Sequence, residues 1–100
     1  MNVISKRGLT EMAEGKRVGS DAMDELQSWY RTARRATWMN LIDVRQDFAD
    51  VDQIGNVLVF NVRHNRYRLI VRAVYPKQKL YVKALLTHKE YDREEWKKWA

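Results

Sequence analysis

Apolar side chains in the first half of the chain recur at the spacing of an α-helix. Between residues 21 and 37 they repeat every three or four positions, and most charged side chains point away from that stripe. The stripe consists of Ala22, Leu26, Trp29 and Ala33. This period predicts an amphipathic helix over 21–37, which Ser20 or Asp21 would cap.

Three shorter patterns surround this helix. The β-branched start of the chain, residues 1–4, predicts a brief strand, and Ser5 can cap a helix that follows it. The apolar positions of that first helix are Leu9, Met12 and Ala13. Residues 43–50 predict a third, short helix.

The period changes to two in the second half, which predicts a meander of three strands. The alternating stretches are 58–62, 67–75 and 80–86. His64 and Asn65 separate the first two, and Asn65 tolerates the positive φ of a tight hairpin. Pro76 begins the second turn. Residues 87–99, which pair glutamates with lysines three positions later, predict a terminal helix.

The segregation of helices from strands predicts an α+β fold, and the length of 100 residues predicts a single domain over 1–100. One face of the meander would pack against the helices. The expected core residues are Leu26, Trp29, Phe60, Tyr67, Leu69, Val82 and Leu86. The opposite, open face would carry Arg68, Arg72, Lys79, Tyr81 and Lys83, a basic surface with an aromatic that suits RNA.

The net charge of +6 is concentrated in one segment. Residues 53–89 hold eight Lys or Arg and no Asp or Glu, whereas the segments on either side each have a net charge of −1. A positive field of this kind favours a polyanion, most often nucleic acid. A basic surface without a ligand is the alternative.

Several classes of protein are excluded or disfavoured by composition. The chain has no cysteine, which excludes disulfide scaffolds, thiolate zinc sites and cysteine nucleophiles. No apolar run approaches the ~20 residues that span a bilayer. Residues 1–20 lack the apolar region of a signal peptide. We therefore expect a cytoplasmic protein without a membrane partner.

The segment after the last strand, residues 87–92, combines a helix start with a titratable group. Thr87 and Glu90 have the spacing of a capping box. His88 would lie in the first helical turn, at the end of the basic strand, and can exchange a proton near neutral pH. A capping box explains Thr87 and Glu90 without any chemistry, and a lone histidine is more often passive than catalytic.

Five motifs together resemble one known family. They are Val3-Ile4-Ser5, Trp29-Tyr30 followed by Trp38, Val59-Phe60-Asn61-Val62, Asn65-Arg66-Tyr67-Arg68-Leu69-Ile70 and Thr87-His88-Lys89-Glu90-Tyr91-Asp92. The chain resembles the HigB toxins of bacterial type II toxin–antitoxin systems, which are related to RelE-type mRNA interferases. The two last motifs, at this separation, are fairly specific together.

The resemblance implies an endoribonuclease that cuts mRNA, usually on the ribosome, and that a helix-turn-helix antitoxin of the HigA type silences. It implies a RelE-like fold with N-terminal helices on a mostly antiparallel sheet. Two departures stand out. His64 stands where the family usually has glycine, and it adds a second histidine. A C-terminal tail, residues 93–100, could pack on the sheet or contact a partner through Trp96 and Trp99.

RNA cleavage assigns roles to the candidate residues. RNA supplies its own nucleophile, so the enzyme needs a base, an acid and cations for the phosphorane. We expect His88 as the base or acid, Arg68 as the main cation, and Lys83 and Tyr91 as further catalytic residues. The remaining RNA-binding candidates are Arg63, Asn65, Arg66, Arg72, Lys79, Tyr81 and Lys89. Carboxylates avoid this face, so we expect neither a metal nor another cofactor.

Two other functions fit the same charge map. A non-catalytic RNA- or ribosome-binding module would use the basic face but would not depend on His88. An interaction protein would dock an acidic peptide there, as an antitoxin contact also would.

Overall fold

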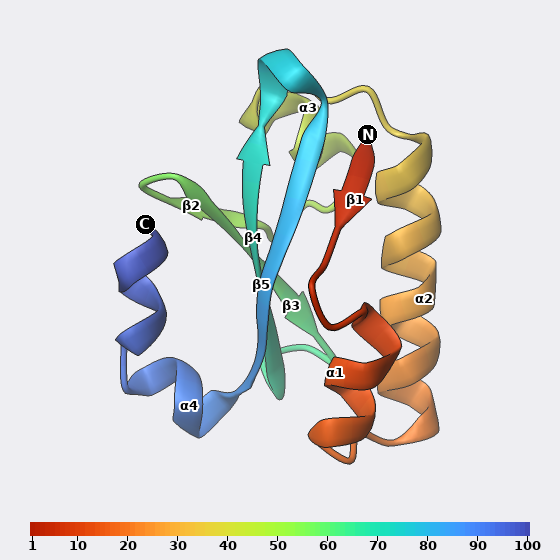
Figure 1. The fold of residues 1–100 in the computed structure, drawn as a ribbon, viewed down its shortest axis with the longest axis vertical. Helices are drawn as coiled ribbons and strands as arrows, with labels where there is room; N and C mark the ends of the chain where they lie inside the picture. Colours follow the sequence, from red (N-terminus) through yellow and green to blue (C-terminus); the bar gives the residue numbers. More distant parts are fainter.

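The computed structural model describes residues 1–100 and contains one mixed five-stranded sheet in the order β1-β5-β4-β3-β2 (Figure 1). The strands are β1 (Asn2–Ile4), β2 (Asp52–Ile54), β3 (Val57–Val62), β4 (Tyr67–Val74) and β5 (Lys79–Thr87). Strands β2 to β5 form an antiparallel meander, and β1 pairs in parallel with β5. The chain therefore has the α+β class that the order of patterns predicts.

The helices divide between the two faces of this sheet. They are α1 (Leu9–Gly15), α2 (Ser20–Arg35), α3 (Leu41–Asp47) and α4 (His88–Asp92), with 3-10 turns η1 (Tyr75–Lys77) and η2 (Glu95–Trp99). Figure 1 shows α1 and α2 on one side of the sheet and α4 with the C-terminus on the other.

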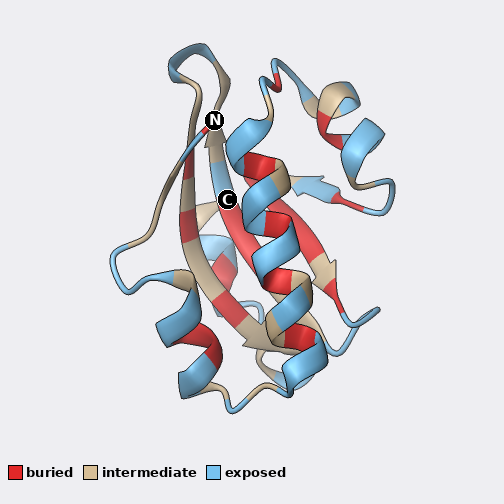
Figure 2. Ribbon diagram, turned by 90° about the vertical axis from the view of Figure 1, so that its right-hand side faces the viewer, coloured by how far each residue is buried: buried red, intermediate tan, exposed pale blue.

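The main core lies between α1, α2 and the sheet. It is a cluster of 18 buried residues, and the apolar stripe of α2 faces it, as the inward-facing buried segments in Figure 2 show. Five predicted core residues, Leu26, Trp29, Phe60, Leu69 and Val82, are buried there, and Tyr67 packs against them half-buried. Phe60 is at the centre of an aromatic group with Trp29, Trp38 and Phe48.

Helix ends differ from the predicted caps. Helix α2 already begins at Ser20, so Gly19 is its N-cap, and neither Ser20 nor Asp21 caps it. Ser5 accepts a hydrogen bond from the Gly8 N–H, but α1 begins only at Leu9. The third helix lies slightly earlier than predicted, because Asn40 caps it through the Asp43 N–H.

A β-bulge in β5 changes which residues reach the core. Ile70 pairs with Ala84, but the next residue, Val71, pairs with Val82, which leaves Lys83 as the extra residue. The alternation therefore shifts after Lys83, and Leu85 rather than Leu86 is buried in the main core. The prediction that Leu86 lies under the helices is wrong, since it packs on the opposite face.

Two further predictions fail in the connecting segments. The hairpin between β3 and β4 has its positive φ at Arg63 and His64, not at Asn65. The predicted helix over 87–99 is broken at Glu94, which has a left-handed φ of 62° and separates α4 from η2. The short, largely exposed strand β2 has no alternating pattern, and the sequence gives no sign of it.

Candidate active site

The face of the sheet away from α1 and α2 holds most of the predicted basic residues. Arg72 lies opposite Val57 and Tyr81 in the register, and Lys79 lies opposite Val74. Directly paired residues project to the same face of an antiparallel sheet. Because Val57 belongs to the apolar cluster on this second face, Arg72 and Tyr81 lie on it as well.

Arg68 occupies the same face four residues before Arg72 in β4, opposite Leu86. Its guanidinium carbon is 5.0 Å from the centre of the Tyr91 ring, within cation–π range. The side chain is half-buried, its Nη1 atom is buried without a hydrogen-bond partner, and no carboxylate lies within 4.0 Å. Arg68 therefore forms no ion pair on the sheet.

Tyr91 is fixed from a second direction. Its ring stacks on Trp96, with 5.0 Å between the ring centres and an angle of 8° between the planes. Trp96 is only 3% exposed and packs against Val57, Val59 and Ile70. The tail that begins at Arg93 thus packs on the sheet, one of the two possibilities that the sequence leaves open.

Helix α4 has the predicted capping box. Thr87 accepts a hydrogen bond from the Glu90 N–H at 3.2 Å, and the Glu90 carboxylate accepts from the Thr87 N–H at 3.0 Å. His88 is therefore the first residue of the helix, and its backbone N–H donates to the Arg66 carbonyl at 3.1 Å. This bond ties the start of α4 to the β3–β4 hairpin.

The His88 side chain lies in solvent beside a carboxylate. Its side chain is 55% exposed, and Nε2 is 3.3 Å from an Asp92 carboxylate oxygen one helical turn later. An imidazole that is oriented by a carboxylate at one nitrogen can exchange a proton at the other. The structure therefore leaves the His88 side chain accessible to a ligand.

The Glu90 carboxylate has a structural role, because it is engaged in the capping box and in an ion pair. Lys16, at the end of α1, donates to its carboxylate at 2.6 Å. Burial acts to raise the pKa of Glu90, but the hydrogen bonds from Lys16 and Thr87 outweigh it and hold the pKa below its usual range. Nothing in the sequence indicates this contact, since Lys16 is 74 residues away.

A second group of candidates lies toward the other end of the face. The Lys83 ammonium is 5.7 Å from the centre of the Tyr81 ring, and Arg72 faces Tyr81 across the strand pair. Four residues along a strand separate Arg72 from Arg68, about 13 Å at the usual rise. The structure thus brings Arg68 and Tyr91 together and places Lys83, Tyr81 and Arg72 at some distance from them.

The hairpin residues and Lys89 are exposed at the end of the face where α4 begins. Arg63 differs from the others, because its backbone N–H donates to the Glu25 carboxylate and its guanidinium lies 3.8 Å from Asp21. This contact draws Arg63 toward α2. Residues 53–89 contain seven further cations, and no carboxylate lies within 4.0 Å of any of them. They are Arg66, Arg68, Arg72, Lys77, Lys79, Lys83 and Lys89.

The structure contains no group of three or more His, Cys, Asp or Glu side chains able to hold a metal ion.

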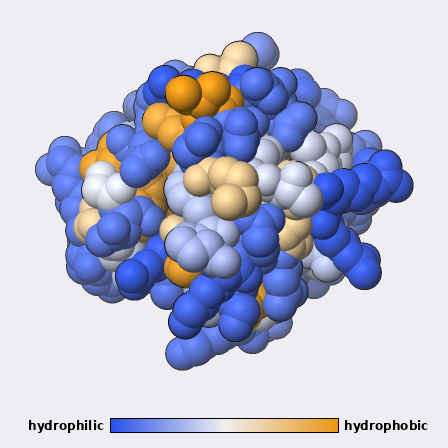
Figure 3. All heavy atoms as spheres, turned by 90° about the horizontal axis from the view of Figure 1, so that it is seen from above, coloured by the Kyte–Doolittle hydropathy of each residue, from blue (hydrophilic) through white to orange (hydrophobic).

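None of its helices is both long and apolar enough to cross a membrane. Seen from above, the surface is mostly hydrophilic with small, separated apolar patches (Figure 3).

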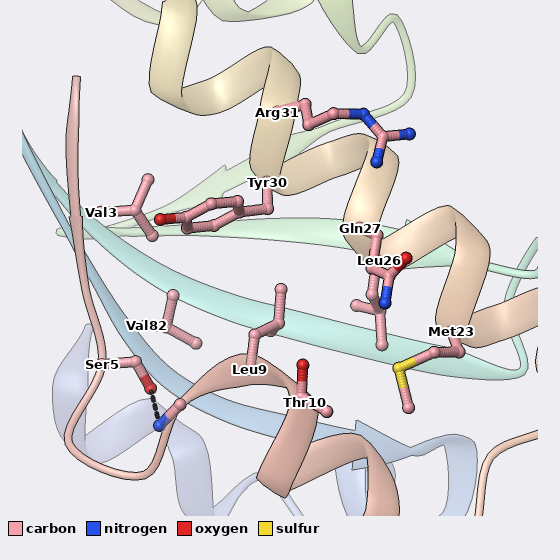
Figure 4. Close-up of a pocket in the computed structure, with 11 residues that line it drawn as sticks. Val3, Ser5, Leu9, Thr10, Met23, Leu26, Gln27, Tyr30, Arg31 and Val82 are labelled. Carbon is pink, nitrogen blue, oxygen red and sulfur yellow. Dashed lines mark hydrogen bonds between the residues drawn. The ribbon is translucent and has the colours of Figure 1, made fainter.

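The largest hollow lies elsewhere, between α1, α2 and β1. It has a volume of about 420 Å³ and is lined by apolar side chains such as Val3, Leu9 and Tyr30, with Arg31 at its edge (Figure 4). It contains no histidine or carboxylate, and it opens on the helix side of the sheet. The chemistry-bearing residues described above therefore do not share it.

Comparison with known proteins assigns the fold to one family. No curated protein matches the chain. The family model described as HigB_toxin, the RelE-like toxic component of a toxin–antitoxin system, matches residues 22–94 and so covers more than half of the chain. The protein thus belongs to the HigB family of RelE-like toxins, and it is the toxic component of a toxin–antitoxin system with an antitoxin as its partner.

Proposed function

We propose that this toxin is an endoribonuclease that cleaves mRNA, most often on the ribosome, without a metal ion. The observation that supports this best is the row of basic side chains without carboxylate partners along β4 and β5, with the exposed His88 at one end. Cations without carboxylate partners are available to an external polyanion such as RNA. We place this activity in the cytoplasm, under the control of a HigA-type antitoxin.

The proposed reaction uses the 2′-hydroxyl of RNA as its nucleophile. The 2′-oxygen forms a bond to phosphorus as its proton passes to a base, and the bond from phosphorus to the 5′-oxygen breaks as that oxygen takes a proton from an acid. The products are a 2′,3′-cyclic phosphate and a 5′-hydroxyl. His88 supplies one of these two proton transfers, with Asp92 holding its imidazole.

Charge stabilisation falls to the guanidinium of Arg68. A guanidinium can bind two phosphate oxygens at once, and no carboxylate of the protein lies within 4.0 Å of Arg68. Tyr91 holds this guanidinium through its ring and can contact the scissile nucleotide. Lys83, Tyr81, Arg72 and Lys79 bind the RNA further along the face, whereas Arg66, Asn65 and Lys89 bind it beside His88, with Arg63 at the rim.

The experiment is cleavage of translated mRNA by purified protein, with His88→Gln against His64→Gln as the matched control. Glutamine keeps much of the size of histidine but cannot titrate. We expect His88→Gln to cut about 10²–10⁴-fold more slowly at unchanged RNA affinity, and His64→Gln to cut like the wild type. The upstream fragment should end in a cyclic phosphate.

The alternatives give different results in the same assay. Wild-type protein that binds ribosomes but cuts nothing would contradict the enzyme and favour a binding module on the same face. Loss of activity in His64→Gln alone would move the proton transfer to the hairpin. A double replacement that still cuts would exclude both histidines from the mechanism.

A further inference from the structure

The tail beyond the family match folds back over the candidate site. The match ends at residue 94, and η2 covers Glu95–Trp99. In Figure 1 this segment lies on the same side of the sheet as α4, opposite α1 and α2. Its contacts therefore fall on the face that holds Arg68 and Tyr91.

Trp96 makes two different contacts with Tyr91. The two rings are stacked at 5.0 Å, and the indole Nε1–H donates to the Tyr91 carbonyl at 3.0 Å. The Arg68 guanidinium contacts the same Tyr91 ring. A chain of direct contacts thus leads from the tail through Tyr91 to the main candidate cation.

The end of the tail is held separately on the hairpin between β2 and β3. The carbonyl oxygen of Ala100 accepts hydrogen bonds from the backbone N–H and the side-chain amide of Asn56, both at 3.0 Å. Gly55 lies directly beneath it, and a Cβ at that position would be 2.5 Å from the Ala100 oxygen. This close approach requires a glycine at position 55. The positive φ of 56° at this position also favours glycine over other residues.

We propose that Trp96 is a positioning residue, which holds Tyr91 and, through it, Arg68 in the geometry that cleavage needs, and that the contact of Ala100 with Gly55 and Asn56 keeps Trp96 in place. This inference rests on the proposed ribonuclease function. A tail that only shields Val57, Val59 and Ile70 from water would need burial of the indole, but neither its stacking nor its hydrogen bond to Tyr91.

The first test separates position from burial by two replacements of Trp96. Trp96→Leu keeps an apolar side chain but removes the ring and the N–H, whereas Trp96→Phe keeps a ring. Since displacement of a catalytic group by about 1 Å can cost 10²-fold in rate, we expect Trp96→Leu to lower kcat by about 10- to 100-fold. KM should change little, and Trp96→Phe should restore most of the rate.

A readout that does not depend on cleavage accompanies the kinetics. The Arg68 guanidinium lies over the Tyr91 ring, so the side-chain N–H resonances of Arg68 report by NMR where that ring lies, and we expect them to move in Trp96→Leu. If the wild type cuts no RNA, the proposed function fails, and these resonances alone decide whether Trp96 sets the position of Tyr91. Unmoved resonances would overturn the inference.

The second test leaves Trp96 in place, in case its replacement unfolds the chain. Gly55→Ala forces the Ala100 carbonyl away, and Gly8→Ala is the matched control, because Gly8 also has a positive φ but no atom within 4 Å of an added Cβ. We expect lower kcat and moved Arg68 side-chain resonances in Gly55→Ala only. Equal effects of the two variants, or a Trp96→Leu protein with lower thermal stability but normal kcat, would contradict the proposal.

Discussion

The two faces of the sheet are covered in different ways. The helix side buries 18 residues in one continuous cluster, whereas the other side buries four, Val57, Val59, Ile70 and Trp96, under a short tail. Arg72 and Lys83 lie beside this smaller cluster with no carboxylate nearby. One face thus provides most of the hydrophobic stabilisation, and the other keeps its polar side chains available for a ligand.

The largest expected difference is in the free energy of unfolding when one side chain is removed from each face. Phe60 is 2% exposed and contacts Trp29, Trp38 and Phe48, so Phe60→Ala should lower the free energy of unfolding by about 3–5 kcal/mol. Arg72→Ala, on the other face, should change it by no more than about 0.5 kcal/mol. Urea denaturation measures both, and similar losses would contradict the division of roles.

Arg68→Ala sharpens the comparison at a half-buried position. Removal of a guanidinium with an unsatisfied Nη1 relieves a desolvation cost and loses one cation–π contact, so thermal stability should change little. RNA cleavage should fall by about 10²–10³-fold, and the salt dependence of RNA binding should flatten by roughly one charge. A protein that unfolds on this change while its RNA affinity stays normal would make Arg68 structural.

Glu90→Gln tests the ion pair that joins the two sides through Lys16. Glutamine keeps the capping box but not the charge. Because the pKa of Glu90 is lowered on folding, its contribution is complete above the ordinary glutamate pKa near 4.5 and is lost as pH falls through the folded value. The free energy of unfolding of the wild type should therefore be higher than that of Glu90→Gln by about 1 kcal/mol at pH 7, and the two should differ little at pH 3.

That difference can be followed by thermal melts across the same pH range. Lys16→Met removes the partner of Glu90 and should match Glu90→Gln at neutral pH. An advantage of the wild type that stays constant down to pH 3 would exclude the ion pair as its source.

The smallest effect should come from the hairpin. His64 has a φ of 61°, where glycine is unstrained, so His64→Gly should raise stability by about 0.5 kcal/mol after the entropy of glycine is deducted. Asn65→Gly is the control, because Asn65 has no positive φ and should lose stability instead. Melting temperatures that rise in His64→Gly and fall in Asn65→Gly would confirm which residues form the turn.

Most of the fold could be predicted because its signals are local. The stripe of α2 and the alternation of β3 and β4 both arise from residues a few positions apart, and the structure confirms them. The burial of Leu85 instead of Leu86 in the main core could not be predicted. It follows from the β-bulge, which depends on the partner strand and leaves no mark in the sequence of β5.

The candidate site shows the same limit. The charge map and the Thr87–Glu90 capping box are readable from residue types and spacing, and the box is confirmed. The stack of Tyr91 on Trp96 and the distance from Arg68 to Lys83 depend on how the tail folds back and on the sheet register. The chemical roles of these residues remain predictions.

The central claim is that RNA binds the face away from α1 and α2. NMR titration with an RNA oligonucleotide methylated at its 2′-oxygens, which cannot be cleaved, tests this most directly. We predict shifts at Arg68, Arg72 and Lys83 on β4 and β5 that weaken with added salt, and none at Leu9 or Tyr30 around the cavity on the helix side. Shifts centred on that cavity, with β4 and β5 unmoved, would contradict the account.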